Sequence, residues 1–186
     1  QLALALVRAN MRRLKGRSIE GDSSLCRKVL DTLPYALTSS QETALTEIKT
    51  DMSSDDRMMR LLQGDVGSGK TVVALMVMLG AVEAGYQTAI MAPTEILARQ
   101  HFETIEPLAK AAGLEVVLLT GRNKGKPRDA ILEKLASGAA HIAIGTHALF
   151  QDDVEFENLG LAVIDEQHRF GVHQRLTLAA KGSAVD

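Results

Sequence analysis

Gly64-Asp65-Val66-Gly67-Ser68-Gly69-Lys70-Thr71 fits the pattern of a phosphate-binding loop, in which two glycines separated by four residues precede a lysine and a threonine. An apolar pair precedes the stretch and an apolar run follows it, which is the strand-loop-helix context that the pattern requires. Glycines let successive backbone N–H groups point at phosphate oxygens, and the following helix adds the positive end of its dipole. We therefore expect all eight residues to bind a nucleoside triphosphate, with Lys70 at the β- and γ-phosphates and Thr71 on Mg²⁺. The alternative is a glycine-rich turn that matches by chance.

Size and composition set limits on the function. The 186 residues are enough for one domain with an appendage or for a piece of a longer protein, and 46% apolar residues can form a core. The formal charge is −2, so contacts to nucleic acid would have to come from local patches. Cys26 is the single cysteine, which excludes a disulfide framework and fits a reducing cytoplasm. The longest apolar run, 72–82, is shorter than the about 20 residues that cross a bilayer, so we expect no membrane partner.

From residue 37 onward, strand and helix patterns alternate. Short apolar runs predict strands at 60–63, 88–92, 115–119, 141–145 and 161–165. Helical spacing predicts helices at 41–52, 70–84, 95–112 and 128–137. The expected N-caps are Ser39 or Ser40, Thr94 and Asp129, and the expected C-terminal glycines are Gly85, Gly113 and Gly138. This alternation indicates an α/β fold with right-handed βαβ units and a mostly parallel sheet flanked by helices.

Residues 1–33 differ from the rest and are interpreted as a helical segment that precedes an ATP-binding domain at 34–186. Five basic residues come before the first acidic one: Arg8, Arg12, Arg13, Lys15 and Arg17. They form either the solvated face of a helix or a basic arm that contacts nucleic acid or a neighbouring domain. A second short helix is expected at 22–33, with Ser23 or Ser24 as its cap and Pro34 at its end.

The last predicted strand ends in two carboxylates, Asp165 and Glu166, about 94 residues after Thr71. In an open α/β sheet, ligands bind at the carboxyl ends of the strands, where the phosphate-binding loop also lies. We expect Asp165 to hold Mg²⁺ and Glu166 to orient and deprotonate the attacking water, which predicts hydrolysis of the nucleotide. A zinc site at His168 and His173 is the alternative, but their spacing is not i, i+4 and no other His or Cys lies near them.

The tetrad Asp-Glu-Gln-His at 165–168 and the residues after it resemble those of superfamily 2 helicases, specifically the RecG-type ATP-dependent DNA helicases. Residues 33–41 resemble the adenine-recognising segment of that family, which implies that Gln41 reads the base edge. Residues 92–101, 119–126 and 144–149 resemble its three strand-contacting motifs. Transcription-coupled repair translocases share much of this pattern, but they are expected to carry a different tetrad.

The resemblance covers nearly the whole chain and implies the first RecA-like lobe of a P-loop NTPase motor. It implies ATP and Mg²⁺ as cofactors and branched DNA, such as stalled forks and Holliday junctions, as the substrate in recombination and repair. It places the protein in the bacterial cytoplasm, associated with the nucleoid. The implied catalytic residues are Lys70, Glu166, Gln167 and His168. The implied DNA contacts are Pro93, Thr94, Gln100, Thr120, Gly121, Arg122, Lys124, Thr146 and His147.

Thr94, Thr120 and Thr146 each follow a predicted parallel strand, where small hydroxyls and backbone N–H groups suit phosphate oxygens rather than base edges. Four basic residues lie within residues 122–128: Arg122, Lys124, Lys126 and Arg128. They form either a solvated loop or a contact to phosphates that weakens with salt.

The resemblance also implies partners that these residues do not supply. The second RecA-like lobe would carry an arginine finger, and the wedge domain of the same polypeptide would precede residue 1. The motif that couples hydrolysis to movement would follow residue 186, on a strand between the phosphate-loop strand and the Asp165 strand. We therefore expect residues 1–186 alone to be poorly stable and nearly inactive. The remaining alternatives are a small-molecule kinase, which would need an acceptor pocket and a lid, and a nucleotide-binding module without activity.

Overall fold

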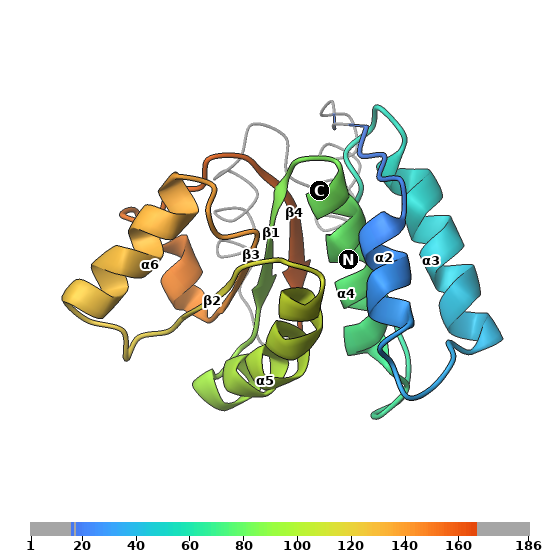
Figure 1. Ribbon diagram of the computed structural model, residues 1–186, viewed down its shortest axis with the longest axis horizontal. Helices are drawn as coiled ribbons and strands as arrows, with labels where there is room; N and C mark the ends of the chain where they lie inside the picture. Colours follow the sequence, from blue (N-terminus) through green and yellow to red (C-terminus); the bar gives the residue numbers. More distant parts are fainter. Residues whose placement is uncertain (1–15, 17, 167–186) are drawn as a thin grey trace, which may run out of the picture.

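The computed structural model describes residue 16 and residues 18–166, and it shows a parallel sheet with helices on both faces (Figure 1). The strands are β1 (Gln87–Met91), β2 (Val116–Leu119), β3 (Ile142–Gly145) and β4 (Leu159–Ile164). The helices are α2 (Ser24–Leu30), α3 (Ser39–Met52), α4 (Lys70–Glu83), α5 (Glu95–Ala111) and α6 (Lys126–Ala136), with a short 3₁₀ helix η1 (His147–Phe150). The predicted α/β class is therefore confirmed.

The strand order is β2-β3-β1-β4, and every neighbouring pair is parallel. Met91 at the end of β1 pairs with Gly145 of β3 and Ile164 of β4, and Leu119 of β2 also pairs with Gly145. The four strands therefore end level with one another. Whatever residue follows each strand lies at the same edge of the sheet.

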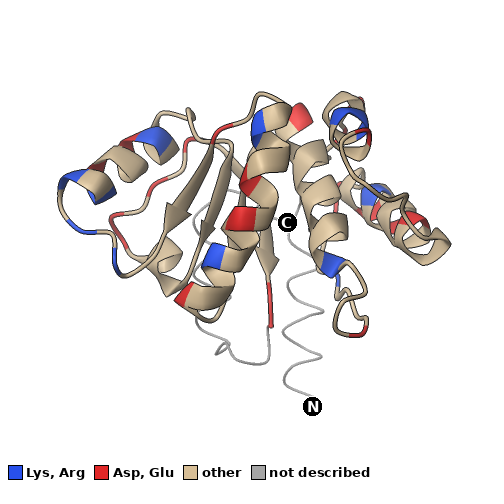
Figure 2. Ribbon diagram, turned by 60° about the horizontal axis from the view of Figure 1, so that its bottom comes forward, with Lys and Arg blue, Asp and Glu red and all other residues tan. Residues whose placement is uncertain are grey.

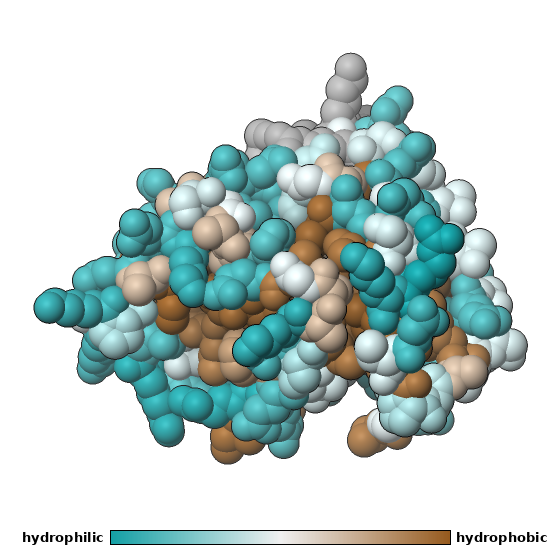
Figure 3. Space-filling model, viewed as in Figure 1, coloured by the Kyte–Doolittle hydropathy of each residue, from teal (hydrophilic) through white to brown (hydrophobic). Residues whose placement is uncertain are grey.

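Alternating side chains of the strands supply two separate cores. Ile90, Ile142 and Ile144 face a cluster that contains the buried residues of α2, α3, α4 and α5. Ala89 and Met91 face a second cluster with α6 and η1. The surface in Figure 3 is largely hydrophilic, with hydrophobic residues showing in its middle.

Helix α4 explains why the sequence after the phosphate-binding loop is apolar on all sides. Nine of its residues are buried: Val72, Val73, Leu75, Met76, Val77, Met78, Leu79, Ala81 and Val82. It packs between the sheet and a second layer made by α2 and α3, as Figure 1 shows. A helix enclosed from both sides needs no polar stripe.

Four of the five predicted strands are confirmed within two residues, but the one at 60–63 is wrong. A strand requires a hydrogen-bonded neighbour, and residues 60–63 pair with no strand in the described part of the chain. Leu61 is 54% exposed, and the guanidinium of Arg60 instead forms ion pairs with Glu47 and Asp51 of α3. The apolar pattern is local, whereas strand pairing depends on another part of the chain.

Two predicted N-caps are also wrong. Thr38, not Ser39 or Ser40, caps α3: its backbone is extended and its hydroxyl accepts a hydrogen bond from Gln41 N. Helix α6 begins at Lys126, directly after Gly125, so Asp129 lies inside the first turn. The local preference of Asp for a cap position is outweighed here by a glycine with a φ of 58° that turns the chain earlier.

The predicted N-cap of α5 and the predicted glycines after α4, α5 and α6 are confirmed. The hydroxyl of Thr94 accepts a hydrogen bond from Leu97 N at the start of α5. Gly85, Gly113 and Gly138 follow α4, α5 and α6 with φ values of 86°, 85° and 74°. A left-handed residue directly after a helix satisfies its last carbonyls, and glycine adopts that conformation without strain.

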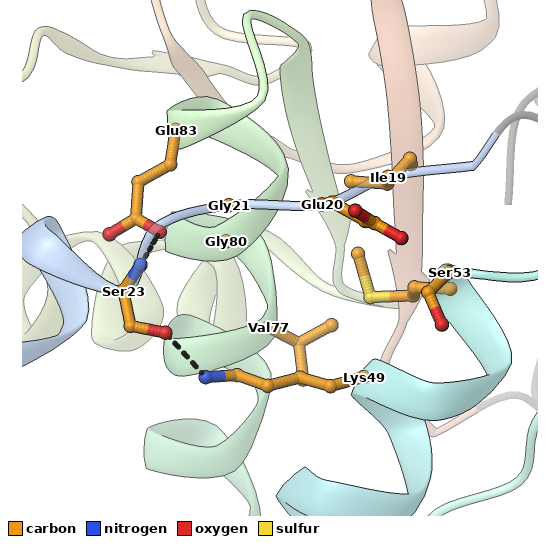
Figure 4. Close-up of a pocket in the computed structure, with 10 residues that line it drawn as sticks. Ile19, Glu20, Gly21, Ser23, Lys49, Ser53, Val77, Gly80 and Glu83 are labelled. Carbon is orange, nitrogen blue, oxygen red and sulfur yellow. Dashed lines mark hydrogen bonds between the residues drawn. The ribbon is translucent and has the colours of Figure 1, made fainter.

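Helix α2 begins in an unexpected way, shown in Figure 4. Ser23 precedes it but makes no side-chain capping bond. The carboxylate of Glu83, at the end of α4, accepts hydrogen bonds from the backbone N–H groups of Ser23 at 2.8 Å, Leu25 at 2.5 Å and Cys26 at 3.1 Å. An acidic group from another helix therefore takes the place of the cap. The helix ends at Leu30, earlier than predicted.

Helix α2 and the segment before it belong to the same core as α4. Ile19 of the segment and Cys26 and Val29 of α2 are buried in the cluster that contains the α4 residues. Ile19 N also donates to Met52 O of α3 at 2.8 Å. The division of the chain at residue 33 stays a prediction, and residues 1–15 and 17 lie outside the described residues.

Candidate functional site

The loop at Gly64–Thr71 leads into the N-terminus of α4 and is shaped by its glycines. Gly67 and Gly69 have φ values of 80° and 78°, in the left-handed region. A Cβ on Gly64 would lie 2.6 Å from Ser68 Oγ, and a Cβ on Gly69 would collide with the amide of Gln41. Side chains at these positions would fill the space in which the loop curls. The backbone therefore forms a cradle of the kind that binds phosphate at the start of a helix.

Lys70 lies across this loop. Its ammonium donates hydrogen bonds to Gly64 O at 2.7 Å and to Asp65 O at 2.8 Å. Asp65 and Val66 form the exposed tip, and Thr71 follows in the half-buried first turn of α4. The positive charge is thus held over the loop, where it can reach phosphate oxygens.

Gln41 lies at the loop, as the resemblance implies. Its Nε2 donates to Ser68 O at 3.0 Å, and its Oε1 accepts from Thr38 N at 2.8 Å. Together with the bond from Gln41 N to Thr38 Oγ1, these contacts fix the start of α3 against the phosphate-binding loop. The reading of an adenine edge by Gln41 stays a prediction.

Asp165 follows β4 at the same edge of the sheet. Its backbone N donates to Met91 O at 2.9 Å, and its Oδ2 lies 2.8 Å from Nε2 of His101 on α5. The hydrogen bond from His101 holds the pKa of Asp165 below its ordinary value, against the effect of partial burial, and the charge of Lys70 acts in the same direction. The carboxylate is therefore ionised at neutral pH and lies within electrostatic reach of the loop.

These groups fit a nucleotide with a divalent cation. A glycine cradle, a lysine, a helix N-terminus and an ionised carboxylate are what a phosphate–Mg²⁺ complex requires. Thr71 and Asp165 are the predicted metal ligands, and this role stays a prediction. A protein-only metal cluster of three or more His, Cys, Asp or Glu residues does not occur in the described ranges.

Glu166 is exposed and has a φ of 52°, which makes it one of two non-glycine residues with positive φ in the described part of the chain. This left-handed conformation costs about 1 kcal/mol for a residue with a Cβ. Strain of this kind concentrates at functional sites. Gln167, His168 and His173 lie outside the described residues.

The three threonines lie at the predicted edge, but their hydroxyls differ in accessibility. Thr94 is exposed, whereas Thr120 and Thr146 are buried. The Thr120 hydroxyl accepts from Arg122 N at 3.3 Å and donates to Asn123 Oδ1 at 3.2 Å, so it shapes its own loop. The Thr146 hydroxyl is buried without a hydrogen-bond partner among the described residues, which is a costly arrangement for a polar group.

The other predicted DNA contacts surround these threonines. Pro93 and Gln100 flank the start of α5, with Gln100 exposed, and Gly121 is exposed after β2. His147 is exposed at the start of η1. All of them therefore belong to segments that leave the carboxyl ends of β1, β2 or β3.

The basic residues at 122–128 divide into two groups. Arg128 donates three hydrogen bonds to Asp153 and one to Gln151, with its side chain only 14% exposed. Arg122 forms an ion pair with Glu95 at 2.7 Å but remains 74% exposed, and Lys124 and Lys126 are exposed. Figure 2 shows Lys and Arg residues along this loop and α6. Arg128 has a structural role, and the other three face solvent.

Three residues of the site were not singled out from the sequence. His101 contacts Asp165, Glu95 pairs with Arg122, and Asn123 binds the backbone N–H of Thr120 at 2.7 Å. For Asn123 a signal exists, because asparagine favours turns in which its side chain bonds a nearby backbone group. The partners of His101 and Glu95 lie on other elements, so nothing in the local sequence marks them.

The chain is similar to helicases along most of its length. The family model for DEAD/DEAH box helicases matches residues 38–184. The ATP-dependent DNA helicase RecG of Aquifex aeolicus is 47% identical over 185 residues, and that of Streptococcus pneumoniae is 58% identical over 155 residues. A solved structure of RecG bound to a three-way DNA junction matches with a TM-score of 0.87 and 43% identity.

These proteins are much longer than the chain described above. The comparison covers 100% of this chain and 23% of the A. aeolicus protein, and 83% of this chain and 23% of the S. pneumoniae protein. For the solved structure the shares are 100% and 25%. In the described part of the chain, no helix combines the length and apolar character needed to cross a membrane.

Proposed function

Because this chain belongs to the DEAD/DEAH box helicase family, we propose that it is the ATP-binding lobe of a RecG-type motor that remodels branched DNA in recombination and repair. The observation that favours this function most is the shared edge of the sheet. The Asp165 carboxylate and the segments at Thr94, Thr120 and Thr146 lie where the parallel strands end, and Lys70 of the phosphate-binding loop is near enough to act electrostatically on that carboxylate. A site for hydrolysis and a surface for phosphates of DNA would therefore be neighbours.

The loop residues would bind the triphosphate. Backbone N–H groups of residues 64–71 would donate to its oxygens, and Lys70 would exchange its bonds to Gly64 O and Asp65 O for bonds to the β- and γ-phosphates. Gln41, fixed between α3 and the loop, would bind the adenine edge. These residues would bind the nucleotide and fix its orientation.

Thr71 and Asp165 would hold Mg²⁺, which when bound neutralises charge on the phosphate oxygens and orients them for in-line attack. Asp165 is suited to this role because its low pKa keeps it charged. Glu166 follows it and would accept the proton of the attacking water. Gln167 and His168 would contact the site as the next residues of the tetrad, and an arginine finger would come from a second lobe of the same polypeptide.

DNA would lie along the carboxyl edge, on the exposed residues of the three loops. Thr94, Gln100, Gly121, Arg122, Lys124 and His147 are exposed there and could bind phosphates without reading bases. The exposed contacts would be supported by three residues of the same loops, Thr120, Thr146 and Pro93. Of these, Thr120 and Thr146 are buried beneath the surface. We place the full protein in the bacterial cytoplasm, where such DNA would be found.

A duplex-DNA translocase of the transcription-coupled repair type is the alternative. The compared relatives are RecG proteins, and the residues after Asp165 are Glu-Gln-His, so this alternative is not favoured. A small-molecule kinase and a module without activity fit the helicase family less well.

The hydrolytic part of this function is tested with Lys70→Ala and Glu166→Gln in the full-length protein. Lys70→Ala removes a phosphate ligand, so we expect it to weaken ATP binding, measured with a fluorescent ATP analogue. Glu166→Gln keeps the binding residues but removes the base, so we expect ATP binding within about twofold of wild type and turnover lower by about 10² to 10⁴. Turnover that persists in Glu166→Gln would overturn the role of Glu166.

A further inference from the structure

His101 connects α5 to the carboxylate of Asp165 by a contact between residues 64 positions apart in the chain. The side chain of His101 is only 12% exposed, and that of Asp165 is 29% exposed. Because an ionised carboxylate can only accept, the His101 Nε2–H donates to Oδ2. The backbone N–H of Glu166 also donates a hydrogen bond to this carboxylate. Two carboxylate oxygens offer about four lone pairs, so lone pairs remain that can bind a cation. The two hydrogen bonds thus limit the orientations that the carboxylate can adopt.

Helix α5 is a rigid support for this bond. Ala98, Ile105 and Ala109 are fully buried against the sheet, and the Thr94 hydroxyl caps the N-terminus. Asp165 is fixed on its other side by the bond of its backbone N to Met91 O. Both ends of the His101–Asp165 contact are therefore attached to rigid elements, which limits the rotation of the carboxylate.

The same helix begins at the surface assigned above to DNA. His101 lies seven residues after Thr94, which is about two turns or about 10 Å along the helix. Glu95, in the first turn, pairs with Arg122 of the loop after β2. A displacement of α5 as a rigid body would therefore move its first turn and the ring of His101 together.

We propose that His101 is a positioning residue for the nucleotide-bound metal: it holds the Asp165 carboxylate in the orientation that binds the cation, and it connects helix α5, which begins at the proposed DNA surface, to that carboxylate. This inference rests on the proposed function, because it gives Asp165 the role of a metal ligand. A carboxylate that is free to rotate binds a cation less tightly than one that is held in the binding orientation. Removal of a hydrogen bond that holds a metal ligand typically lowers metal affinity about 10- to 100-fold. The alternative is a histidine that only fills space between α5 and β4.

The test uses three variants of the full-length protein. His101→Phe keeps the ring volume without a donor, and His101→Gln returns an N–H at about the position of Nε2. Glu103→Ala changes an exposed residue of the same helix and serves as the matched control. Each protein is saturated with a non-hydrolysable ATP analogue, and its affinity for Mn²⁺ is measured by electron paramagnetic resonance. Thermal unfolding of each variant is recorded in parallel.

We expect His101→Phe to weaken Mn²⁺ binding at least about tenfold and His101→Gln to recover most of that loss, with Glu103→Ala unchanged. In an Asp165→Ala background, His101→Phe should have no further effect on Mn²⁺ affinity, because His101 acts through Asp165. A wild-type Mn²⁺ affinity in His101→Phe would overturn the proposal, even if its thermal midpoint fell. An equal loss in both backgrounds would also overturn it.

These outcomes are distinct from a failure of the proposed function. If the wild-type protein binds nucleotide and Mn²⁺ but shows no DNA-dependent ATP turnover, the proposed function as a DNA motor is contradicted. The Mn²⁺ affinities of the variants would still decide the role of His101. The connection between α5 and Asp165 is tested by a separate measurement. At saturating Mg²⁺, the rate of ATP turnover with DNA is divided by the rate without DNA. His101→Phe should lower this ratio, whereas an unchanged ratio would limit His101 to metal positioning and overturn the connection.

Discussion

Gly69 and Gly85 have the same backbone conformation but different surroundings. Gly69 precedes α4 and Gly85 follows it, and both have a positive φ, 78° for Gly69 and 86° for Gly85. A Cβ on Gly69 would strike the Gln41 amide, whereas a Cβ on Gly85 meets nothing within 4 Å. The two positions therefore separate the cost of the left-handed conformation from the cost of filling the phosphate cradle.

We expect Gly69→Ala to weaken nucleotide binding more than tenfold, which corresponds to at least about 1.4 kcal/mol, because the loop must open to accommodate the methyl group. Gly85→Ala should leave nucleotide affinity unchanged and cost only about 1 kcal/mol of stability for the left-handed residue. Titration with a fluorescent ADP analogue measures the first effect and thermal unfolding the second. Equal nucleotide affinities of the two variants would contradict the role of the Gly69–Gln41 contact.

At the scale of elements, helices α2 and α4 are joined by the carboxylate of Glu83. It accepts three backbone hydrogen bonds at the start of α2, and Lys49 of α3 donates to the nearby Ser23 Oγ at 3.1 Å (Figure 4). These groups border a cavity of about 240 Å³. Helix α2 is thereby attached to the helix that follows the phosphate-binding loop.

Glu83→Ala should loosen α2, because three N–H groups lose their acceptor. We expect a local cost of about 2 kcal/mol, or about 30-fold faster hydrogen exchange in α2, measured by mass spectrometry on the full-length protein. Glu83→Gln keeps one acceptor oxygen and should lie between wild type and Glu83→Ala. Unchanged exchange in α2 would show that the carboxylate does not hold this helix.

The burial of Cys26 provides a second test of the packing of α2 against α4. Its Sγ lies 3.3 Å from Met76 O of α4, and burial raises the pKa of the thiol to about 11. The thiol is therefore neutral, and the stability from its raised pKa is present below pH 9 and is lost as the pH rises toward 11. We expect slow alkylation of Cys26 by iodoacetamide at pH 8, read by peptide mapping, and faster alkylation in Glu83→Ala. Rapid alkylation of the native protein would contradict this packing.

The loop between β2 and α6 has both structural and solvent-facing cations. Lys124→Ala should lower DNA affinity and reduce the slope of log affinity against log salt by about 1, the value for one lost phosphate contact. Arg128→Ala should leave that slope unchanged and lower the thermal midpoint, since its guanidinium binds Asp153 and Gln151. Fluorescence anisotropy at several salt concentrations separates the two. A lower slope for Arg128→Ala alone would reverse these assignments.

At the scale of the whole molecule, the sequence predicts what depends on local pattern. The phosphate-binding loop, four strands and the terminal glycines of the helices all follow from residue types with strong local preferences. The absence of a strand at 60–63, the cap of α2 by Glu83 and the His101–Asp165 bond are decided by parts of the chain far away in sequence. Such contacts leave no mark on neighbouring residues, so only the folded structure reveals them.

The parallel order β2-β3-β1-β4 brings the carboxylates and the threonine loops to one edge, and the proposed coupling of hydrolysis to DNA rests on this arrangement. The most direct test is ATP turnover by the full-length protein without DNA, with linear duplex and with a three-way junction of the same total length. We predict that the junction stimulates turnover well above the linear duplex and that Glu166→Gln abolishes the stimulated rate. Equal turnover under all three conditions, or stimulation by linear duplex alone, would contradict a motor for branched DNA.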